Sequence, residues 1–488
     1  MMQKIWSISG RSIAVSALAL ALTACQSMRG PEPVVKATIP SSYTNASGTS
    51  VAEQGYKNFF ADQRLLQVLD LALTNNRDLR IAALNIQRAQ QQYQITENNQ
   101  LPTIGASGSV LRQVTPTRDP NNPYSSYNVG LGVTAYELDF WGRVRSFNDN
   151  ALATYLATSS ARDATQIALI SQVSQAWLNH AFANANLKLA EQTLKAQLES
   201  YNLNKKRFDV GIDSEIPVRQ AQISVETARN DVANYKTQVA QAKNLLNLLV
   251  GETVPENLLP AQRITRITNT NSIGSGLPSD LLNNRPDVRA AEYKLSAAGA
   301  NIGAAKARLF PTISLTGSAG YASTDLNNLF KSGNFAWSIG PSLDLPVFDW
   351  GTRRANIKIS KTDQEIALSD YEKSIQSAFR EVNDALAVRQ NIGDRLAAQR
   401  RLVDATNTTY KLSNARFRAG IDSYLTVLDA QRSAYGAEQG LLLLEQANLN
   451  NQVELYKTLG GGVKANTTDQ VEKQPSSSDV KYKKVDQK

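Results

Sequence analysis

The sequence of 488 residues contains one cysteine, Cys25, and one histidine, His180. A single cysteine cannot form a disulfide within the chain or supply a cysteine-based metal site. A single histidine likewise excludes a multi-histidine metal site, and we expect His180, which follows Trp177, to be a packed helix residue. The stretch GANIGAAK at 299–306 lacks the GKS or GKT ending of a phosphate loop, and GASGS at 105–109 lacks the last glycine of GxSxG. The sequence therefore predicts a protein that is not an enzyme and that holds no metal and no cofactor.

Charge of one sign is not concentrated anywhere in the chain. The 52 Lys and Arg residues against 43 Asp and Glu give a formal net charge of +9. The basic residues are scattered and are not clustered with aromatic residues, so the electrostatic footprint of a nucleic-acid-binding protein is missing. We expect no nucleic-acid partner.

Proline and glycine are scarce in two long stretches. Residues 143–210 contain neither, and residues 352–419 contain no proline and only Gly393. Both stretches are rich in Ala, Gln, Leu, Glu, Lys and Arg, which are good helix formers. A helix of this length extends for about 100 Å. Because such a helix is too long for a compact domain and too polar to cross a membrane, the pattern predicts a coiled coil.

The apolar spacing of the second stretch supports this interpretation. Apolar residues follow one another in steps of four and three, and Arg389 is the one charged residue in the stripe. The stripe consists of Tyr371, Ile375, Ala378, Val382, Ala385, Ile392 and Leu396. A sustained seven-residue repeat favours side-by-side helices, and its small residues indicate close packing.

The chain is a tandem duplication. The octapeptide RFDVGIDS at 207–214 returns 209 positions later as RFRAGIDS at 416–423. Other matches at this offset are LPTI at 101–104 with FPTI at 310–313, and Trp141-Gly142 with Trp350-Gly351. Each copy is much longer than a solenoid repeat, so each copy is a whole structural unit.

Each octapeptide directly follows one of the long helical stretches. Gly211 and Gly420 suit the left-handed residue that ends a helix. Candidate caps for the next helix are Asp213 or Ser214 in the first copy and Asp422 or Ser423 in the second. We therefore expect the octapeptides to be the tips of two long helical hairpins, at residues 142–251 and 350–460.

Upstream of each hairpin the apolar period changes to two, which indicates β-strands. The alternating apolar residues include Tyr127, Val129, Leu131 and Val133 in the first copy, and Ile313, Leu315, Phe335, Trp337 and Ile339 in the second. Each strand has about the 9 to 11 residues that a membrane strand needs. Four strands cannot close a membrane barrel, and an open edge in lipid leaves backbone groups unpaired, so several chains would have to share one barrel. A small soluble β-layer is the alternative.

The first residues have the pattern of a targeting segment. A positively charged stretch precedes a short apolar run, which ends in LTAC at 22–25 and resembles a bacterial lipobox. In this interpretation residues 1–24 are a signal peptide that is removed, and Cys25 carries a covalent lipid. An ordinary signal peptide with a chance cysteine is the alternative.

Together these features resemble the TolC/OprM-like outer membrane factors, and most closely their lipidated drug-efflux branch. The resemblance covers about residues 20–462 and includes the strand-to-helix junctions FWGRVR and DWGTRR, the RFxxGIDS tips, and YLTVLDAQR followed by LYKTLGGG. It implies a mixed α/β membrane protein that forms a homotrimer. Four strands per chain would build a twelve-strand outer membrane β-barrel, continued by a long periplasmic α-helical coiled-coil barrel with an equatorial mixed region.

The resemblance also implies a function, which is the passive exit duct of a tripartite multidrug efflux pump, gated at its periplasmic end. The protein would be lipid-anchored in the cell outer membrane and would extend into the periplasm. Its partners would be outer membrane lipid, a periplasmic adaptor (membrane fusion protein) and an inner membrane transporter of the resistance-nodulation-division (RND) class. Two alternatives stay open: the duct of a type I protein secretion system, and a periplasmic coiled-coil tether lipoprotein that transports nothing.

The motif YLTVLDAQR carries the gate residues that the resemblance implies. Leu425 would form an apolar constriction, Asp429 a ring of carboxylates below it, and Arg432 a contact that holds inner and outer helices together. Gln220 stands at the position of Asp429 in the first copy, so we expect the second hairpin to be the one that moves. The alternative for Asp429 is a solvated or salt-bridged helix residue. The residues expected to dock the adaptor are Gly211, Ile212, Asp213, Gly420, Ile421 and Asp422.

These expectations divide the chain into eight segments. They are a signal peptide (1–24), an N-terminal segment with a first equatorial or tunnel helix (25–100), the first strand pair (101–141), the first hairpin (142–251), a linker with a second equatorial helix (252–309), the second strand pair (310–349), the second hairpin (350–460) and a disordered tail (461–488).

Overall fold

The structure is a computed structural model of the whole chain. It describes residues 28–36, 49–50, 54–114, 123–260, 263–269, 273–274 and 284–462. The described residues belong to two units. The first draws on Met1–Lys36, Leu84–Ser159 and Ala290–Lys373, and the second on Ala37–Ala83, Ser160–Arg289 and Ser374–Lys488.

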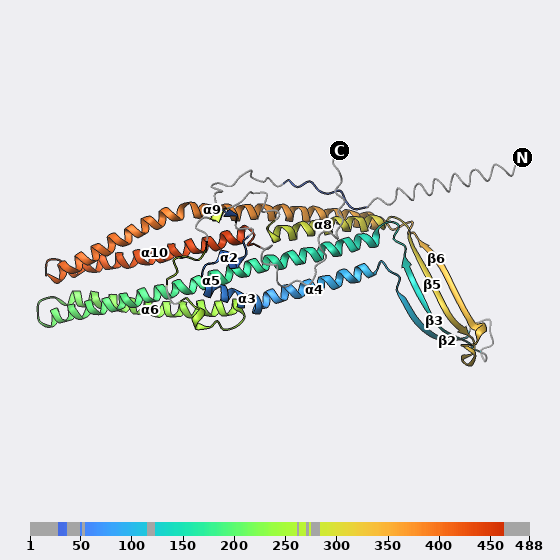
Figure 1. Cartoon of the computed structure of the whole chain (residues 1–488), viewed down its shortest axis with the longest axis horizontal. Coiled ribbons are helices and arrows are strands. Elements are labelled where there is room, and N and C mark those ends of the chain that lie inside the picture. The colour runs from blue at the N-terminus through green and yellow to red at the C-terminus, as the bar shows by residue number, and fades with distance from the viewer. Residues whose placement is uncertain are drawn as a thin grey trace. The chain divides into compact units, whose positions relative to one another are not determined.

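The first unit contains a four-stranded antiparallel sheet with the strand order β2-β3-β5-β6 (Figure 1). The strands are β2 (Ile104–Gln113), β3 (Tyr124–Glu137), β5 (Thr312–Ser323) and β6 (Phe335–Asp344). The strands of each copy pair with each other, and β3 also pairs with β5 across the two copies. The alternation in the sequence thus predicts the strands correctly. Within the described residues, β2 and β6 each keep one edge without a strand partner.

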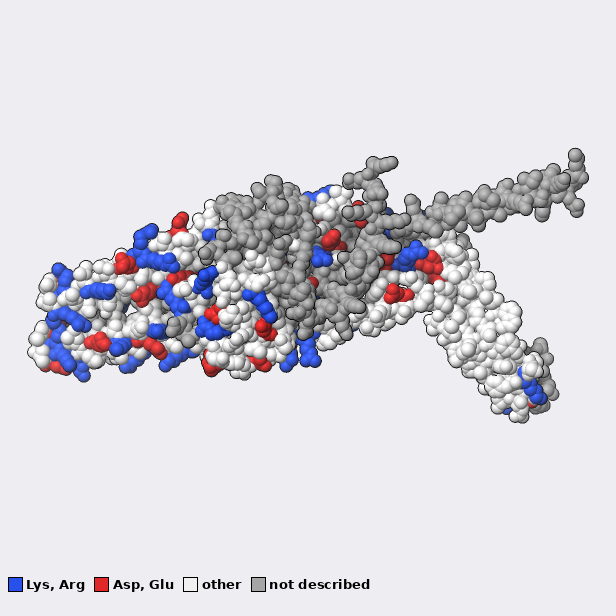
Figure 2. Space-filling model, viewed as in Figure 1, with Lys and Arg blue, Asp and Glu red and all other residues white. Residues whose placement is uncertain are grey.

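The sheet has one apolar face and one polar face, because successive side chains of a strand point to opposite sides. One row across the apolar face is Ala106, Leu131, Ala319 and Trp337. On the other face serine hydroxyls pair across β5 and β6: Ser314 with Ser342 at 2.7 Å and Ser318 with Ser338 at 2.8 Å. The charged residues of the four strands, Arg112, Glu137 and Asp344, lie in the last two positions of a strand. Figure 2 accordingly shows the strands as a surface with little charge.

Two hairpins of long helices account for most of the helical structure (Figure 1). They are α5 (Arg143–Asp209) with α6 (Glu215–Val250), and α9 (Thr352–Arg418) with α10 (Tyr424–Thr458). The long helices α5 and α9 have 67 residues each. Aspartates hold their first turns: Asp139 accepts from the Arg145 N–H at 2.8 Å, and Asp349 accepts from the Arg353 N–H at 3.0 Å.

The predicted stripe of α9 is the buried face of that helix. Ile375, Ala378, Val382, Ala385, Ile392 and Leu396 are buried, while Tyr371 and Arg389 are half-buried. Ile392 and Leu396 form a cluster with Leu441 of α10. The heptad pattern therefore describes the packing of α9 against its hairpin partner.

The remaining elements of the described residues are shorter. They are β1 (Thr49–Ser50), α2 (Tyr56–Phe59), α3 (Gln63–Asn75), α4 (Arg77–Asn98), η1 (Glu256–Leu258), β4 (Ile273–Gly274), α8 (Pro286–Ala307), η2 (Leu326–Asn328) and η3 (Ser332–Asn334). The GANIGAAK stretch lies within α8, so it forms no phosphate loop. None of the described helices is both long enough and apolar enough to cross a bilayer.

The residues that follow α6 contact both hairpins. We call the described residues 251–260 and 263–269 the strap. Its Leu258 carbonyl accepts a hydrogen bond from the Trp177 indole at 3.0 Å, and Trp177 is fully buried. Further along, Arg263 pairs with Glu445 of α10. The strap therefore joins α5 to α10 within the second unit. His180 lies one turn from Trp177 and is buried, as predicted.

Candidate functional site

The two octapeptides form hairpin tips with the same backbone hydrogen bonds. In the first tip, the Gly211 N–H donates to the Phe208 carbonyl and the Ile212 N–H to the Arg207 carbonyl, both at 2.9 Å. The second tip repeats these bonds from Gly420 to Phe417 and from Ile421 to Arg416, also at 2.9 Å. This is the Schellman motif of helix C-termini, which needs a left-handed residue. Gly211 and Gly420 supply it with φ values of 77° and 75°.

The tip aspartates do not cap the following helices. Ser214 and Ser423 stand at the N-cap positions, and neither side chain makes a capping hydrogen bond. The carboxylates instead form ion pairs with the preceding helix, Arg207–Asp213 at 3.2 Å and Arg416–Asp422 at 2.6 Å. The hydrogen bond from Arg416 lowers the pKa of Asp422 below its usual range. Each aspartate therefore stabilises its tip by pairing with the helix before it, whereas the sequence predicted that it would cap the helix after it.

Each tip presents an aliphatic side chain between its glycine and its aspartate. Ile212 is 67 % exposed and Ile421 is 64 % exposed. Both side chains are therefore accessible from solvent. The structure thus brings together, within each tip, the three residues that the sequence assigns to docking.

The three predicted gate residues lie on the exposed side of α10, just after the second tip. Leu425 is 59 % exposed, and Asp429 and Arg432 are also exposed. Positions four and seven residues apart share one helix face. Within the described part of the chain, neither Asp429 nor Arg432 has a hydrogen bond or ion pair. The predicted contact of Arg432 between helices therefore stays a prediction.

The opposite face of the same turns is buried against the first hairpin. We call this group the tip cluster; it consists of Ala221, Phe417, Tyr424, Val427 and Leu428, with Tyr201, Leu203 and Tyr410 packed against it. Burial raises the pKa of Tyr424 to about 12. Neither apolar spacing nor a motif in the sequence predicts this cluster. Its one signal was the pair Phe208 and Phe417, which are counterparts in the two copies, although only Phe417 is buried.

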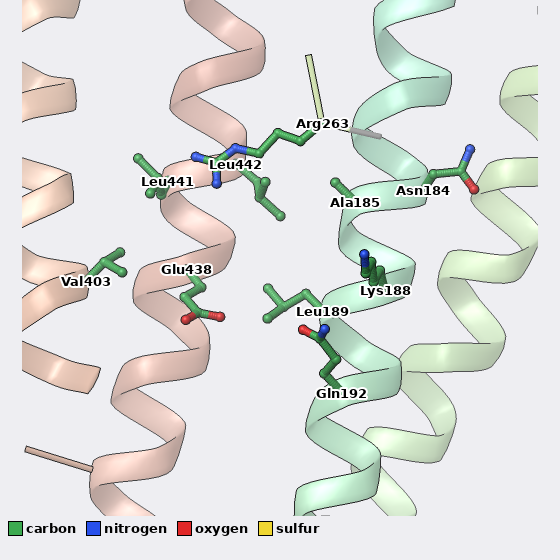
Figure 3. A pocket seen from close by; sticks show the side chains of 10 residues that line it. All are labelled: Asn184, Ala185, Lys188, Leu189, Gln192, Arg263, Val403, Glu438, Leu441 and Leu442. Atoms are coloured by element: carbon green, nitrogen blue, oxygen red, sulfur yellow. The ribbon is translucent and has the colours of Figure 1, made fainter. Parts of the chain in front are cut away.

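A cavity of about 410 Å³ lies between α5 and α10, away from the tips. Figure 3 shows its lining: Lys188 and Gln192 from α5 face Glu438 from α10, and Arg263 of the strap reaches across between the two helices. Charges of both signs line it, and Glu438 accepts a hydrogen bond from Asn407 at 2.9 Å. The cavity contains none of the predicted site residues.

Two predictions concern residues or groups outside these tips. The lipidation residue Cys25 lies outside the described residues. Across the described ranges, no three His, Cys, Asp or Glu side chains are grouped so that they could hold a metal ion. Burial lowers the pKa of His180, which favours its neutral form.

The arrangement of a four-stranded sheet and two long helical hairpins is found in outer membrane channels of known structure. The open-state outer membrane channel MtrE of Neisseria gonorrhoeae matches with a TM-score of 0.83 and 37 % identity, over 90 % of this chain and 98 % of that chain. A membrane protein from Pseudomonas aeruginosa matches with a TM-score of 0.84 and 37 % identity, over 89 % and 97 % of the two chains. The predicted fold class, a membrane channel with a β-domain and a helical hairpin domain, is confirmed.

Sequence comparison then identifies the family. The family model of outer membrane efflux proteins matches twice, at residues 68–252 and 277–461, which is once in each copy of the duplication. The antibiotic efflux pump outer membrane protein ArpC of Pseudomonas putida is 43 % identical over 447 residues, or 89 % of this chain and 91 % of that protein. The cation efflux system protein CusC of Escherichia coli is 36 % identical over 459 residues, or 91 % and 97 %. This chain belongs to the outer membrane efflux protein family.

Family membership confirms three predictions: the resemblance, the function of an outer membrane efflux channel, and the location in the outer membrane. The family is one of ducts rather than of enzymes. The relatives named above are efflux components, which favours efflux over protein secretion and over a tether.

Proposed function

We propose that three copies of this chain form the exit duct of a tripartite multidrug efflux pump, and that the second hairpin gates this duct at its periplasmic end. The proposed gate rests on one observation: the first turns of α10 have one exposed face and one buried face. Leu425 and Asp429 are exposed there, while Val427 on the opposite face is buried in the tip cluster. A buried face fixes the helix, and an exposed face is free to line a lumen.

The sheet supports a shared barrel. A membrane barrel needs about eight strands or more, and an unpaired edge is costly in lipid. One chain supplies four strands and leaves the edges of β2 and β6 open within the described residues. Three copies joined through these edges give twelve strands, with the apolar face toward lipid and the serine-rich face toward the lumen.

The gate follows from repeating one hairpin around the axis of such a trimer. Three copies of Asp429 then make a narrow anionic ring, which is a known kind of selectivity and gating element, and three copies of Leu425 make an apolar constriction beside it. Arg432 holds inner and outer helices together. The first hairpin carries Ile216 and Gln220 at the corresponding positions, so its counterpart ring has no charge.

The pump partners follow from the passive nature of the duct. A periplasmic adaptor docks on the two tips, where Ile212 and Ile421 are exposed. An inner membrane transporter of the RND class supplies the energy. A lipid on Cys25 anchors the chain to the outer membrane.

The substrate class is inferred from relatives. The names of the similar proteins refer to antibiotics, toluene and solvents, and in one case to cations. The proteins named for antibiotics, toluene or solvents are 40 to 45 % identical to this chain, against 36 % for the cation efflux protein. We assign drugs and organic solvents to this duct.

The test is single-channel conductance in a planar bilayer, with wild type, Asp429→Ala and the matched control Gln220→Ala. A gate at Asp429 predicts a small wild-type conductance that rises in Asp429→Ala and stays unchanged in Gln220→Ala. A large wild-type conductance that no variant changes would mean a permanently open pore and would refute the gate. An equal rise in both variants would mean that the two hairpins gate together.

The lipid anchor is tested separately by intact mass spectrometry. Wild type should carry a diacylglyceryl and acyl mass that is lost in Cys25→Ser. A mature wild-type chain with an unmodified thiol would refute the anchor while leaving the channel unaffected.

A further inference from the structure

Trp141 lies between β3 and α5 in the first copy of the duplication, and its side chain contacts the second copy. Its indole N–H donates to the Pro311 carbonyl at 2.8 Å. Its ring stacks on Phe310 with 4.7 Å between the ring centres and 20° between the planes. Both parts of the Trp141 side chain thus have a partner: the apolar ring is stacked, and the indole N–H is hydrogen-bonded.

Trp350 is the counterpart of Trp141 in the second copy, and it lacks these partners. It is 89 % exposed, and its ring contacts only Phe348 among the described aromatic side chains, at 4.6 Å. No hydrogen bond from its indole N–H is found in the described part of the chain. Its backbone is left-handed with a φ of 54°, which is an outlier for a bulky residue. Strain of this kind persists where the surrounding structure or an interaction requires it.

A matching surface for Trp350 is present at the opposite edge of the sheet. Leu101 and Pro102 are the counterparts, at the same offset of 209, of Phe310 and Pro311. Leu101 is 65 % exposed, and the Pro102 carbonyl accepts no hydrogen bond within the described residues. Leu101 and Pro102 precede the edge strand β2, and Trp350 follows the edge strand β6.

We propose that Trp350 of one copy of this chain docks on Leu101 and Pro102 of the next copy. The indole N–H of Trp350 donates to the Pro102 carbonyl, and its ring packs on Leu101, as Trp141 does on Pro311 and Phe310 within one chain. The inference rests on the proposed trimer. In a closed ring of six repeats, every tryptophan then joins its repeat to the following one. Trp141 makes this contact once within each of the three chains, and Trp350 makes it once at each of the three interfaces between chains. The shared element is the hydrogen bond, because an aliphatic Leu101 replaces the stacked ring of Phe310.

The test is a pair of double-cysteine variants treated with a short bis-maleimide cross-linker. The first variant carries Trp350→Cys with Pro102→Cys. The matched control carries Trp141→Cys with Pro311→Cys, a pair that is joined within one chain. Each single variant is run alongside, so that any reaction of Cys25 is identified. Denaturing gels show which chains are linked, and native mass spectrometry reports the oligomeric state before treatment.

The expected result is covalent dimers and trimers in the first variant and only cross-linked monomers in the control. A trimer by native mass that yields no linked chains in the first variant would overturn the Trp350 contact and leave the proposed assembly standing. A monomer by native mass in wild type would overturn the assembly itself.

A conservative variant tests the hydrogen bond without cysteines. Trp350→Phe keeps an aromatic ring and removes the donor, so the trimer should dissociate at a lower temperature while the circular dichroism of the chain stays unchanged. Trp141→Phe should instead lower the temperature at which the chain itself unfolds. An unchanged dissociation temperature in Trp350→Phe would overturn the proposed hydrogen bond.

Discussion

The guanidinium of Arg207, in the last turn of α5, lies 5.2 Å from the centre of the Phe417 ring, in the last turn of α9. The two residues belong to different copies of the duplication, so this contact joins the two hairpins directly behind their tips. A cation–π contact contributes about 0.5–1 kcal/mol at an exposed site and more when it is desolvated. Because Phe417 is buried in the tip cluster, any separation of the hairpins at this level exposes its ring to water.

We predict that Phe417→Ala loosens both tips. Replacing a buried phenylalanine by alanine costs about 3–5 kcal/mol, and here the loss falls on the contact between hairpins. Amide hydrogen exchange over residues 201–214 and 410–428 should therefore accelerate. The control is Phe208→Ala, the counterpart in the first tip, which is 42 % exposed and should change exchange little. Equal acceleration in the two variants would contradict the assignment.

The glycines that end the helices should differ in their tolerance of alanine. Gly211 has a φ of 77° and open space around it, so Gly211→Ala adds only backbone strain of about 1–2 kcal/mol. Gly251 has a φ of 85°, and a Cβ there would lie 2.5 Å from the Asn75 carbonyl oxygen, so Gly251→Ala adds a clash to the strain. Thermal unfolding should rank Gly251→Ala as the less stable variant. The second copy offers the same comparison with Gly420→Ala and Gly460→Ala, and a reversed order in both copies would refute the explanation.

The two faces of the sheet should respond differently to charge. Leu131 lies on the apolar face and is 59 % exposed, so Leu131→Arg places a cation against lipid. Such a substitution costs about 2–4 kcal/mol near the middle of the bilayer. Ser318→Arg, on the serine-rich face, should be tolerated because we propose that this face lines the lumen. The measurement is the amount of each variant recovered in the outer membrane fraction. Good recovery of Leu131→Arg with loss of Ser318→Arg would mean that the two faces are assigned the wrong way round.

The N-cap of α3 should make stability depend on pH. Asp62 accepts from the backbone N–H groups of Arg64 at 2.9 Å and Leu65 at 3.4 Å, and its carboxylate also pairs with the Arg64 guanidinium at 2.8 Å. Burial alone would raise the pKa of Asp62, but the hydrogen bonds from Arg64 and Leu65 and the charge of Arg64 together lower it. A carboxyl with a lowered folded-state pKa stabilises the protein fully above its unfolded pKa of about 3.9, and this contribution is lost as the pH falls through the folded value.

We therefore expect Asp62→Ala to lower the free energy of unfolding by about 1 kcal/mol at neutral pH. The difference from wild type should hold down to about pH 4 and shrink below it. Denaturant unfolding of the detergent-solubilised protein across this range measures it. Asp394→Ala, at an exposed position of α9, is the control and should show no such difference. A difference between Asp62→Ala and wild type that does not depend on pH would rule out the ionised cap.

The sequence predicts the regular elements well because local rules govern them. The long helices end just before Gly211 and Gly420, since only glycine takes the left-handed conformation there without strain. The strands follow from alternation, and their counterparts in the two copies repeat it.

Contacts between distant residues could not be predicted in the same way. Asp213 pairs with an arginine six positions earlier only because the Schellman turn folds the chain back, so its capping role was the simpler expectation. Trp141 and Trp350 occupy equivalent motifs, yet one is hydrogen-bonded and the other exposed. Because the motif is the same in both copies, its residues alone do not predict which tryptophan has a hydrogen-bond partner within the chain.

The lack of charge within the strands has a consequence for how the channel responds to acid. Arg112, Glu137 and Asp344 are the only charged residues of the four strands, and all lie at strand ends. Between these ends the wall holds no carboxylate or imidazole that gains a proton as the pH falls from neutral. The electrostatic potential along this part of the wall is therefore insensitive to the acidity of the medium, and any effect of acid on conduction must arise outside the interiors of these strands.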